Sequence, residues 1–381
     1  MTPLPNRRSA LRHIAQGAAA AMALPAWAQS DRRILLGQSA ALTGPAAELG
    51  LQMNRGARIF FERLNAEGGV NGRTIEIKAL DDGYEPERCA ANTETLLNKD
   101  NVFALFGYVG TPTSLAALPL VNAAGVPFFG AFTGAEALRE PFSRNVFHVR
   151  ASYFDETALI VKQLTSLGLT RIAVCRQNDS YGQAGLDGVL RALKASKLDP
   201  TAVGLVERNS VDVAAAVQTI VASKPDAVVQ IGAYKGCAAF VRAARKAGYG
   251  GTFYNVSFVG TKALADALDK DALGVVISQV MPFPFSTTTA ISREYLDAVK
   301  RAGGDATPNY SSMEGYIGAK VLAEGLKRAG GNLTREGLVN ALEGLQRFDA
   351  GGYLVSFAPR NHRGSSFVEL SMLTGDGKVR R

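Results

Sequence analysis

The sequence predicts an α/β protein in which two lobes, each a doubly wound parallel sheet, are joined by several chain crossings. Short β-rich runs alternate with helical stretches over most of the 381 residues, which indicates strand–helix–strand units. Several strand runs, such as Ala227–Ile231, are continuously apolar, as is typical of parallel strands covered by helices on both faces. The alternation pauses at Val149–Phe154 and at Met281–Thr288, which favours two units that rotate about a hinge.

The individual elements follow from hydrophobic periodicity. Ile160, Leu164 and Leu167 fall on one helical face, and Thr334 is placed to cap the helix that follows it. The expected strands are Ile34–Gly37, Thr74–Leu80, Val102–Phe106, Val126–Gly130, Ile172–Cys175, Val203–Val206, Ala227–Ile231, Val275–Val280, Gly352–Phe357 and Phe367–Leu373. The expected helices are Met53–Ala66, Glu87–Leu97, Asp155–Leu167, Leu186–Ala195, Phe240–Ala247, Ala290–Arg301, Met313–Arg328 and Glu336–Leu342.

Residues 1–28 have the pattern of an export signal. The paired arginines of the segment NRRSALR precede an Ala-rich apolar run at residues 14–24, and small residues follow at the cleavage positions of Ala26-Trp27-Ala28. The two arginines predict twin-arginine export, with a Sec signal as the alternative. The apolar run is shorter than the roughly 20 residues that span a bilayer. We therefore expect a mature periplasmic protein that begins near Gln29.

The charge of the mature chain does not indicate a nucleic-acid partner. Removal of the signal takes away Arg7, Arg8 and Arg12 and no acidic residue, so the formal charge falls from +8 to +5. No dense basic run with interleaved aromatic residues is present. We expect a soluble protein, and a monomer.

The sequence predicts neither a metal, nor a cofactor, nor catalytic residues. Cys89, Cys175 and Cys237 share no metal-ligand spacing and are expected to be buried free thiols, and only three histidines are present. The chain has no G-x-S-x-G elbow, Walker loop, H-E-x-x-H helix or dinucleotide-binding G-x-G-x-x-G. His148 and Arg150 share a face of an extended segment, and we interpret them as structural residues at a lobe crossing.

Polar groups suited to a carboxylate follow two strands of the first lobe. The loop Gly107–Ser114 combines glycines with three hydroxyl residues before a helix expected to begin near Leu115. Gly130–Gly134 brings small residues and a further hydroxyl to the same sheet edge, where ligands of open α/β sheets bind. Free N–H groups and hydroxyls at a helix N-terminus bind anions. An equally good interpretation is that the hydroxyls only cap the helix.

The second lobe offers aromatic side chains after its strands. Tyr181, Tyr234 and Phe258 each follow an expected strand or extended segment. Tyrosine presents a broad apolar face with one hydrogen-bonding group, which suits a lobe that closes over a small organic molecule.

Several motifs together resemble the leucine/isoleucine/valine-binding branch of type I periplasmic solute-binding proteins, which serve ABC importers. The motifs are LTGPAAELG, GARIFFERLNAEGGVNGRTIEI, DDGYEPERCAAN, GYVGTPTS, NDSYGQAG and the late HRG, and they cover nearly all of the mature chain. The resemblance implies two lobes, three hinge crossings and a ligand in the cleft. It implies lobe 1 at residues 29–149 plus 282–361, and lobe 2 at residues 150–281 plus 362–381.

The resemblance also suggests which residues bind the ligand. Thr111 matches the hydroxyl residue that holds a ligand carboxylate, and Ala131 and Thr133 match positions that bind the backbone of an amino acid. Tyr181 and Tyr234 match the closing aromatic residues of the second lobe.

Two positions depart from the family pattern. Ser257, just before Phe258, stands where amino-acid-binding members have a glutamate that pairs with the ligand's ammonium group. A buried ammonium without an acidic partner is costly. Either the ligand lacks an amine or another acid replaces this glutamate. Gly110 stands at a cysteine position, so the family disulfide is not preserved.

The resemblance implies an extracytoplasmic solute-binding protein that captures a small carboxylate-bearing ligand, an amino acid or an organic or aromatic acid. Its partners would be that small molecule and the permease subunits of an ABC importer. Two alternatives remain at this point: a sensor on the same fold that signals to a receptor, and an exported hydrolase or lyase.

Overall fold

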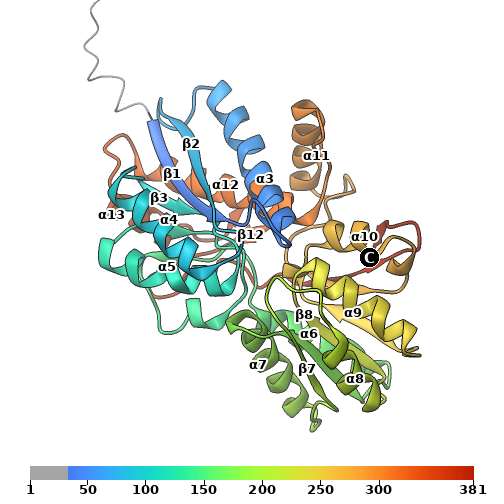
Figure 1. Ribbon diagram of the computed structural model, residues 1–381. Coiled ribbons are helices and arrows are strands. Elements are labelled where there is room, and N and C mark those ends of the chain that lie inside the picture. Colours follow the sequence, from blue (N-terminus) through green and yellow to red (C-terminus); the bar gives the residue numbers. More distant parts are fainter. Residues whose placement is uncertain (1–32) are drawn as a thin grey trace, which may run out of the picture.

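The chain forms two large β-sheets (Figure 1). The computed structural model describes residues 33–381, so the predicted export signal of residues 1–28 lies outside the described residues. The first sheet is parallel throughout, in the order β2-β1-β3-β4-β5. Its strands are β1 (Arg33–Ala40), β2 (Thr74–Asp81), β3 (Ala104–Phe106), β4 (Phe128–Phe129) and β5 (Val146–Phe147). From β1 the chain adds β2 on one side and then β3, β4 and β5 on the other, which confirms that the first lobe is doubly wound.

The second sheet has the order β14-β13-β10-β9-β8-β6-β7. Its parallel strands are β6 (Ile172–Gln177), β7 (Val203–Val206), β8 (Ala227–Ile231), β9 (Thr252–Asn255) and β10 (Val276–Gln279). The edge departs from the expected parallel arrangement, because β13 (Glu369–Leu373) and β14 (Val379–Arg380) pair antiparallel. A turn as short as residues 374–378 can join only antiparallel strands. A separate hairpin joins β11 (Phe348–Asp349) to β12 (Leu354–Val355).

Helices cover both faces of each sheet. In the first lobe α3 packs against α12 and α4 against α5, whereas in the second lobe α6 packs against α7 and α8 against α9 (Figure 1). The α-helices of the described chain are α3 (Ala47–Ala66), α4 (Pro86–Asn98), α5 (Thr111–Ala124), α6 (Tyr153–Ser166), α7 (Ser180–Ala195), α8 (Ala214–Ala222), α9 (Tyr234–Lys246), α10 (Thr261–Leu268), α11 (Ala290–Ala302), α12 (Tyr310–Ala329) and α13 (Arg335–Glu343). None of them is long and apolar enough to cross a membrane.

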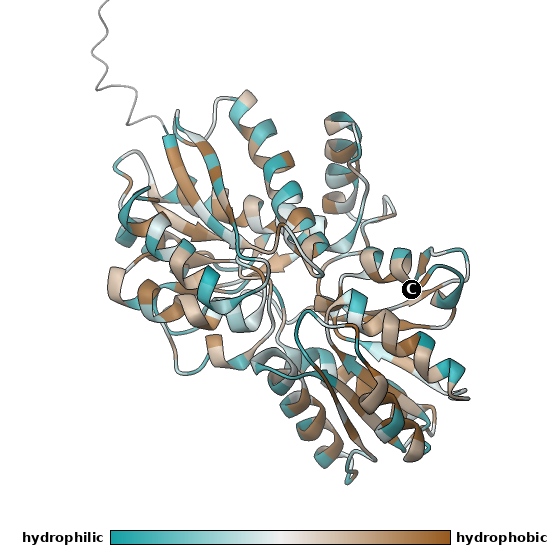
Figure 2. Cartoon of the chain, viewed as in Figure 1, coloured by the Kyte–Doolittle hydropathy of each residue, from teal (hydrophilic) through white to brown (hydrophobic). Residues whose placement is uncertain are grey.

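The hydrophobic core follows the strand pattern that the sequence predicts. The strands are mainly hydrophobic, while helices such as α11 carry hydrophilic residues along one side (Figure 2). Every residue of β8 is buried, as expected for a central strand with helices on both faces. Thr334 caps α13 as predicted, since its Oγ1 accepts a hydrogen bond of 2.9 Å from the backbone N–H of Gly337.

The chain passes between the two sheets three times: after β5, after β10 and before β13. At the first and third crossings His148 pairs with Arg363 in a parallel β-bridge. The Tyr353 hydroxyl lies 2.9 Å from the carbonyl oxygen of Val149 and 3.1 Å from that of Val280, so it links the first and second crossings. The three segments therefore form one bonded hinge.

Candidate functional site

Three hydroxyl groups meet at the N-terminus of α5. Thr111 Oγ1 lies 2.7 Å from Thr133 Oγ1, and Thr133 Oγ1 donates a hydrogen bond of 3.2 Å to Tyr153 Oη. The three side chains are fully buried. The expected helix start near Leu115 is wrong, because α5 begins at Thr111. The earlier start places Thr111 in the first turn, where backbone N–H groups have no partner within the helix.

The sequence gives no sign that α5 begins at Thr111, because the residue before it has no side chain that could cap the helix. Gly110 occupies the N-cap position with φ 102° and makes no side-chain cap. A Cβ atom at Gly110 would lie 2.2 Å from Cε2 of Tyr84, so the tyrosine ring takes the space of any larger residue. The described cysteines Cys89, Cys175 and Cys237 are buried and free, as expected. In place of a disulfide, an aromatic ring packs over Gly110.

An aromatic cluster connects the two lobes in front of the hydroxyl groups. Phe258, which follows β9 in the second lobe, is its centre. Its ring centroid lies 4.5 Å from that of Tyr181, 5.6 Å from that of Phe132 and 5.8 Å from that of Tyr84. The Tyr181 ring also packs against Tyr153, at 5.4 Å. All five rings are buried, so the lobes are closed over the hydroxyl groups.

Two further expected site residues, Ala131 and Tyr234, differ in how close they lie to this cluster. Ala131 is 2% exposed, and its carbonyl oxygen accepts a hydrogen bond of 2.8 Å from the backbone N–H of Thr133. Tyr234, the first residue of α9, makes no ring contact with Phe258 and instead faces Glu48 of α3, across the lobes. Burial raises the pKa of Tyr234. The structure therefore brings Thr111, Thr133, Tyr181 and Phe258 together and places Tyr234 apart from them.

Three charged side chains are buried beside the cluster. Arg150 Nη2 donates a hydrogen bond of 3.2 Å to Glu156 Oε1, and Arg150 Nη1 lies 3.5 Å from Glu314 Oε1. Burial alone lowers the pKa of Arg150, but the charges of Glu314 and Glu156 raise it above its usual value. Burial raises the pKa of Glu314 to about 7, against the attraction of Arg150. The sequence pattern places Arg150 at the lobe crossing but does not predict its ion pairs with the two glutamates.

Glu156 lies beside the position where the family pattern has a glutamate. Its Oε2 accepts from the backbone N–H of Ser257 at 2.7 Å and from Ser278 Oγ at 2.6 Å. Its Oε1 accepts from Ser257 Oγ at 3.0 Å, in addition to Arg150. The absence of an acid at position 257 was the signal that could have led to Glu156. Every hydrogen-bonding position of this carboxylate is occupied by the protein.

Comparisons with known proteins place this chain in a family. The family model described as "Periplasmic binding protein" matches residues 33–378. The chain belongs to this family. Leu/Ile/Val-binding protein homolog 7 of Brucella suis is 27% identical over 337 residues, covering 84% of this chain and 82% of that relative.

Two solved structures resemble this periplasmic binding protein over nearly its whole length. A possible leucine/isoleucine/valine-binding protein from Rhodopirellula baltica is 36% identical, with a TM-score of 0.88, and covers 92% of this chain and 96% of its own. A substrate-binding periplasmic protein from Ralstonia solanacearum is 34% identical, with a TM-score of 0.86. The match covers 91% of this chain and 99% of that protein. These relatives are named as binding proteins and not as enzymes, which favours binding over the enzyme alternative.

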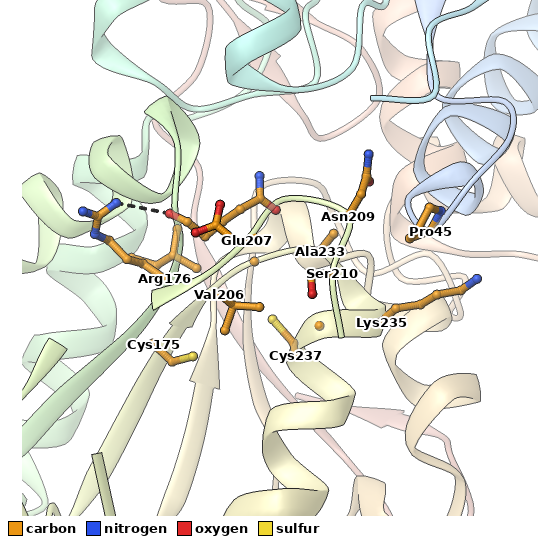
Figure 3. Close-up of a pocket in the computed structure, with 14 residues that line it drawn as sticks. Pro45, Cys175, Arg176, Val206, Glu207, Asn209, Ser210, Ala233, Lys235 and Cys237 are labelled. Carbon is orange, nitrogen blue, oxygen red and sulfur yellow. Dashed lines mark hydrogen bonds between the residues drawn. The ribbon is translucent and has the colours of Figure 1, made fainter. Parts of the chain in front are cut away.

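A hollow of about 420 Å³, part of it open to solvent, lies at the carboxyl ends of β6, β7 and β8 of this periplasmic binding protein. Cys175 and Cys237 lie at its base, and Pro45 of the first lobe faces it (Figure 3). Beside it, Arg208 Nη2 of the second lobe donates a hydrogen bond of 2.8 Å to Glu85 Oε2 of the first. Asn209 Nδ2 also donates to Glu85, at 2.8 Å. Polar contacts therefore hold the lobes together at this edge of the cleft.

Proposed function

We propose that this periplasmic binding protein captures a small carboxylate-bearing ligand between its lobes and delivers it to the permease subunits of an ABC importer. The observation that carries the proposal is the hydroxyl chain from Thr111 through Thr133 to Tyr153 at the N-terminus of α5. Hydroxyl donors and free helix N–H groups together stabilise an anion.

Closure of the lobes supplies the mechanism of capture. The ligand's carboxylate binds Thr111 and Thr133 of the first lobe, and Tyr181 and Phe258 of the second lobe then cover its apolar part. A ligand that contacts both lobes stabilises the closed state, because it binds that state more tightly than the open one. No covalent step is needed.

The proposal also covers the location of the protein, its oligomeric state and the boundaries of its lobes. Export by a twin-arginine or Sec signal would deliver the mature chain to the periplasm as a monomer. The proposed lobes are residues 29–149 plus 282–361 and residues 150–281 plus 362–381. The pairing of His148 with Arg363 and the contacts of Tyr353 support hinge boundaries near these positions.

Thermal unfolding of purified residues 29–381 with a panel of amino acids and organic acids tests the proposal. A ligand that binds only the native state adds about 2.7 kcal/mol of stability at 100 times its dissociation constant. We expect the midpoint to rise with at least one small carboxylic acid and not with the corresponding primary amide. A panel in which amides work as well as acids would contradict the carboxylate assignment.

A further inference from the structure

Arg150 lies beside the hydroxyl groups of the cleft, although it belongs to the first hinge crossing. Its guanidinium carbon is 5.0 Å from the ring centroid of Phe132, which stands between Ala131 and Thr133. It is also 6.0 Å from the ring centroid of Tyr153, whose hydroxyl belongs to the hydroxyl chain. The Arg150 side chain is 1% exposed. A permanently charged donor thus lies buried beside the hydroxyl groups.

Only part of this guanidinium is used by the protein. Nη2 donates to Glu156 and contacts Ser257 Oγ. Nε and Nη1 donate no hydrogen bond to any described residue, although Nη1 forms the longer ion pair with Glu314. The hydroxyl of Tyr181, which packs against the same Tyr153 ring, is also buried without a partner among the described residues. Buried donors without acceptors are costly, and charged ones most of all.

Two carboxylates near the hydroxyl groups, Glu156 and Asp179, are already hydrogen-bonded by the protein. Glu156 accepts from Arg150, Ser257 and Ser278. Asp179 caps α7 and also accepts from Gln177 Nε2 at 2.6 Å. The third, Glu314, forms an ion pair with Arg150, at 3.5 Å. A ligand ammonium would therefore compete with Arg150 for an acid, whereas a ligand oxygen would find unpartnered N–H and O–H donors.

We infer that Arg150 binds a second oxygen group of the ligand, so that the ligand is an acid without an amine that carries a further oxygen acceptor. Oxo-acids, hydroxy-acids and dicarboxylates share this chemistry. This inference rests on the function proposed above and deepens it: Thr111 and Thr133 bind the first carboxylate, and Arg150 with Tyr181 selects the second group.

Matched ligands test the inference on the unaltered protein by isothermal titration. Leucine, 2-oxo-4-methylpentanoate and 4-methylpentanoate differ only at carbon 2, and glutarate and pentanoate differ only by a second carboxylate. We expect the oxo-acid or the dicarboxylate to bind roughly 10- to 100-fold more tightly than its plain partner, as for a hydrogen bond to a charged group. Leucine is expected to bind more weakly than 2-oxo-4-methylpentanoate.

Two variants test whether the preference for a second oxygen group depends on the donors of Arg150 and Tyr181. Arg150→Lys keeps a positive charge beside Glu156 and Glu314 but lacks the planar fork, and Tyr181→Phe removes a hydroxyl that no described residue binds. We expect each variant to reduce the preference for the second oxygen at least threefold while plain acids still bind. Arg335→Lys is the control, because Arg335 donates to the carbonyl oxygens of Val102 and Phe103, away from the cleft.

The outcomes separate the two proposals. Equal binding of plain and oxygen-bearing acids would overturn the role of Arg150 and leave the carboxylate function standing. Tighter binding of leucine than of its oxo-acid would do the same. If no acid binds, both proposals fail. If Arg150→Lys does not fold, the ligand pairs and Tyr181→Phe decide, and a preference for the second oxygen that Tyr181→Phe leaves unchanged would contradict the inference.

Discussion

The ring of Tyr84 occupies the space that a side chain at Gly110 would need. A Cβ atom at Gly110 would lie 2.2 Å from Cε2 of Tyr84, and Gly110 has φ 102°. The same ring packs against Phe258 of the other lobe, and its hydroxyl accepts a hydrogen bond of 3.3 Å from Gln177 Nε2. The missing side chain at position 110 therefore allows a contact between the lobes.

Gly110→Ala is expected to destabilise the protein by about 2–4 kcal/mol, because it combines a positive φ with a steric clash. Urea unfolding measures the change. Gly72→Ala is the control, since Gly72 has φ 76° and no atom lies within 4 Å of the place its added methyl group would take, so it should cost only about 1 kcal/mol. Adding Tyr84→Ala should reduce the cost of Gly110→Ala. Equal costs for both glycines would contradict the steric explanation.

Thr111→Val is expected to weaken binding of carboxylic acids at least tenfold, because it removes a hydroxyl from the anion site while keeping the side-chain shape. Isothermal titration measures the affinity. Thr93→Val is matched to it: Thr93 Oγ1 lies 3.0 Å from Tyr108 Oη in the core of the first lobe. Both variants should lose about 1 kcal/mol of stability, and only Thr111→Val should lose affinity. A similar loss in both would assign the effect to folding.

Glu314→Gln is expected to change how stability depends on pH. Burial raises the pKa of Glu314 from 4.5 to about 7, so the folded state keeps a proton that the unfolded state loses. This contribution is fully present below pH 4.5 and is lost as pH rises through 7. Across that interval the unaltered protein should lose roughly 2–3 kcal/mol relative to Glu314→Gln, where Arg150, Glu156 and Arg139 are unchanged. Parallel urea-unfolding profiles of the two proteins would show that Glu314 does not titrate in this range.

Glu85→Ala is expected to weaken the closed state, because Glu85 accepts hydrogen bonds from Arg208 and Asn209 across the lobes. These side chains are partly exposed, so the dissociation constant should rise only about two- to fivefold. The faster ligand release should be seen by stopped-flow fluorescence. Glu76→Ala breaks a surface pair with Arg33 within the first sheet and should leave release unchanged. Identical release rates would show that the Glu85 contacts do not favour closure.

Much of the fold could be predicted because hydrophobic periodicity determines the central elements. The limits of β7 and β8 agree with the predicted runs, since both are short apolar segments between polar loops. Helix starts were less accurate. α7 begins at Ser180, six residues before the predicted start, because Asp179 caps it by accepting from the N–H groups of Tyr181 and Gly182. α8 and α10, of nine and eight residues, were not predicted, whereas the equally short α13 was, because Thr334 marks its start.

The candidate site could be predicted only where its residues follow strands at the same edge. Thr111 and Thr133 lie together for this reason, and their roles as ligand contacts stay predictions. Only part of the charged group of Arg150, Glu156 and Glu314 is local in the sequence, because Glu156 lies in the first turn of α6, six residues after Arg150. Glu314 lies on α12, far away in the sequence, and tertiary packing alone brings it to Arg150.

The first described strand and the last belong to different sheets, β1 to one lobe and β14 to the other (Figure 1). Rotation of the lobes therefore changes the distance between the two ends of the described chain. A donor and an acceptor fluorophore attached near Arg33 and Arg380 would convert ligand capture into a change in energy transfer. The architecture is thus suited to an optical biosensor for whichever acid the cleft selects.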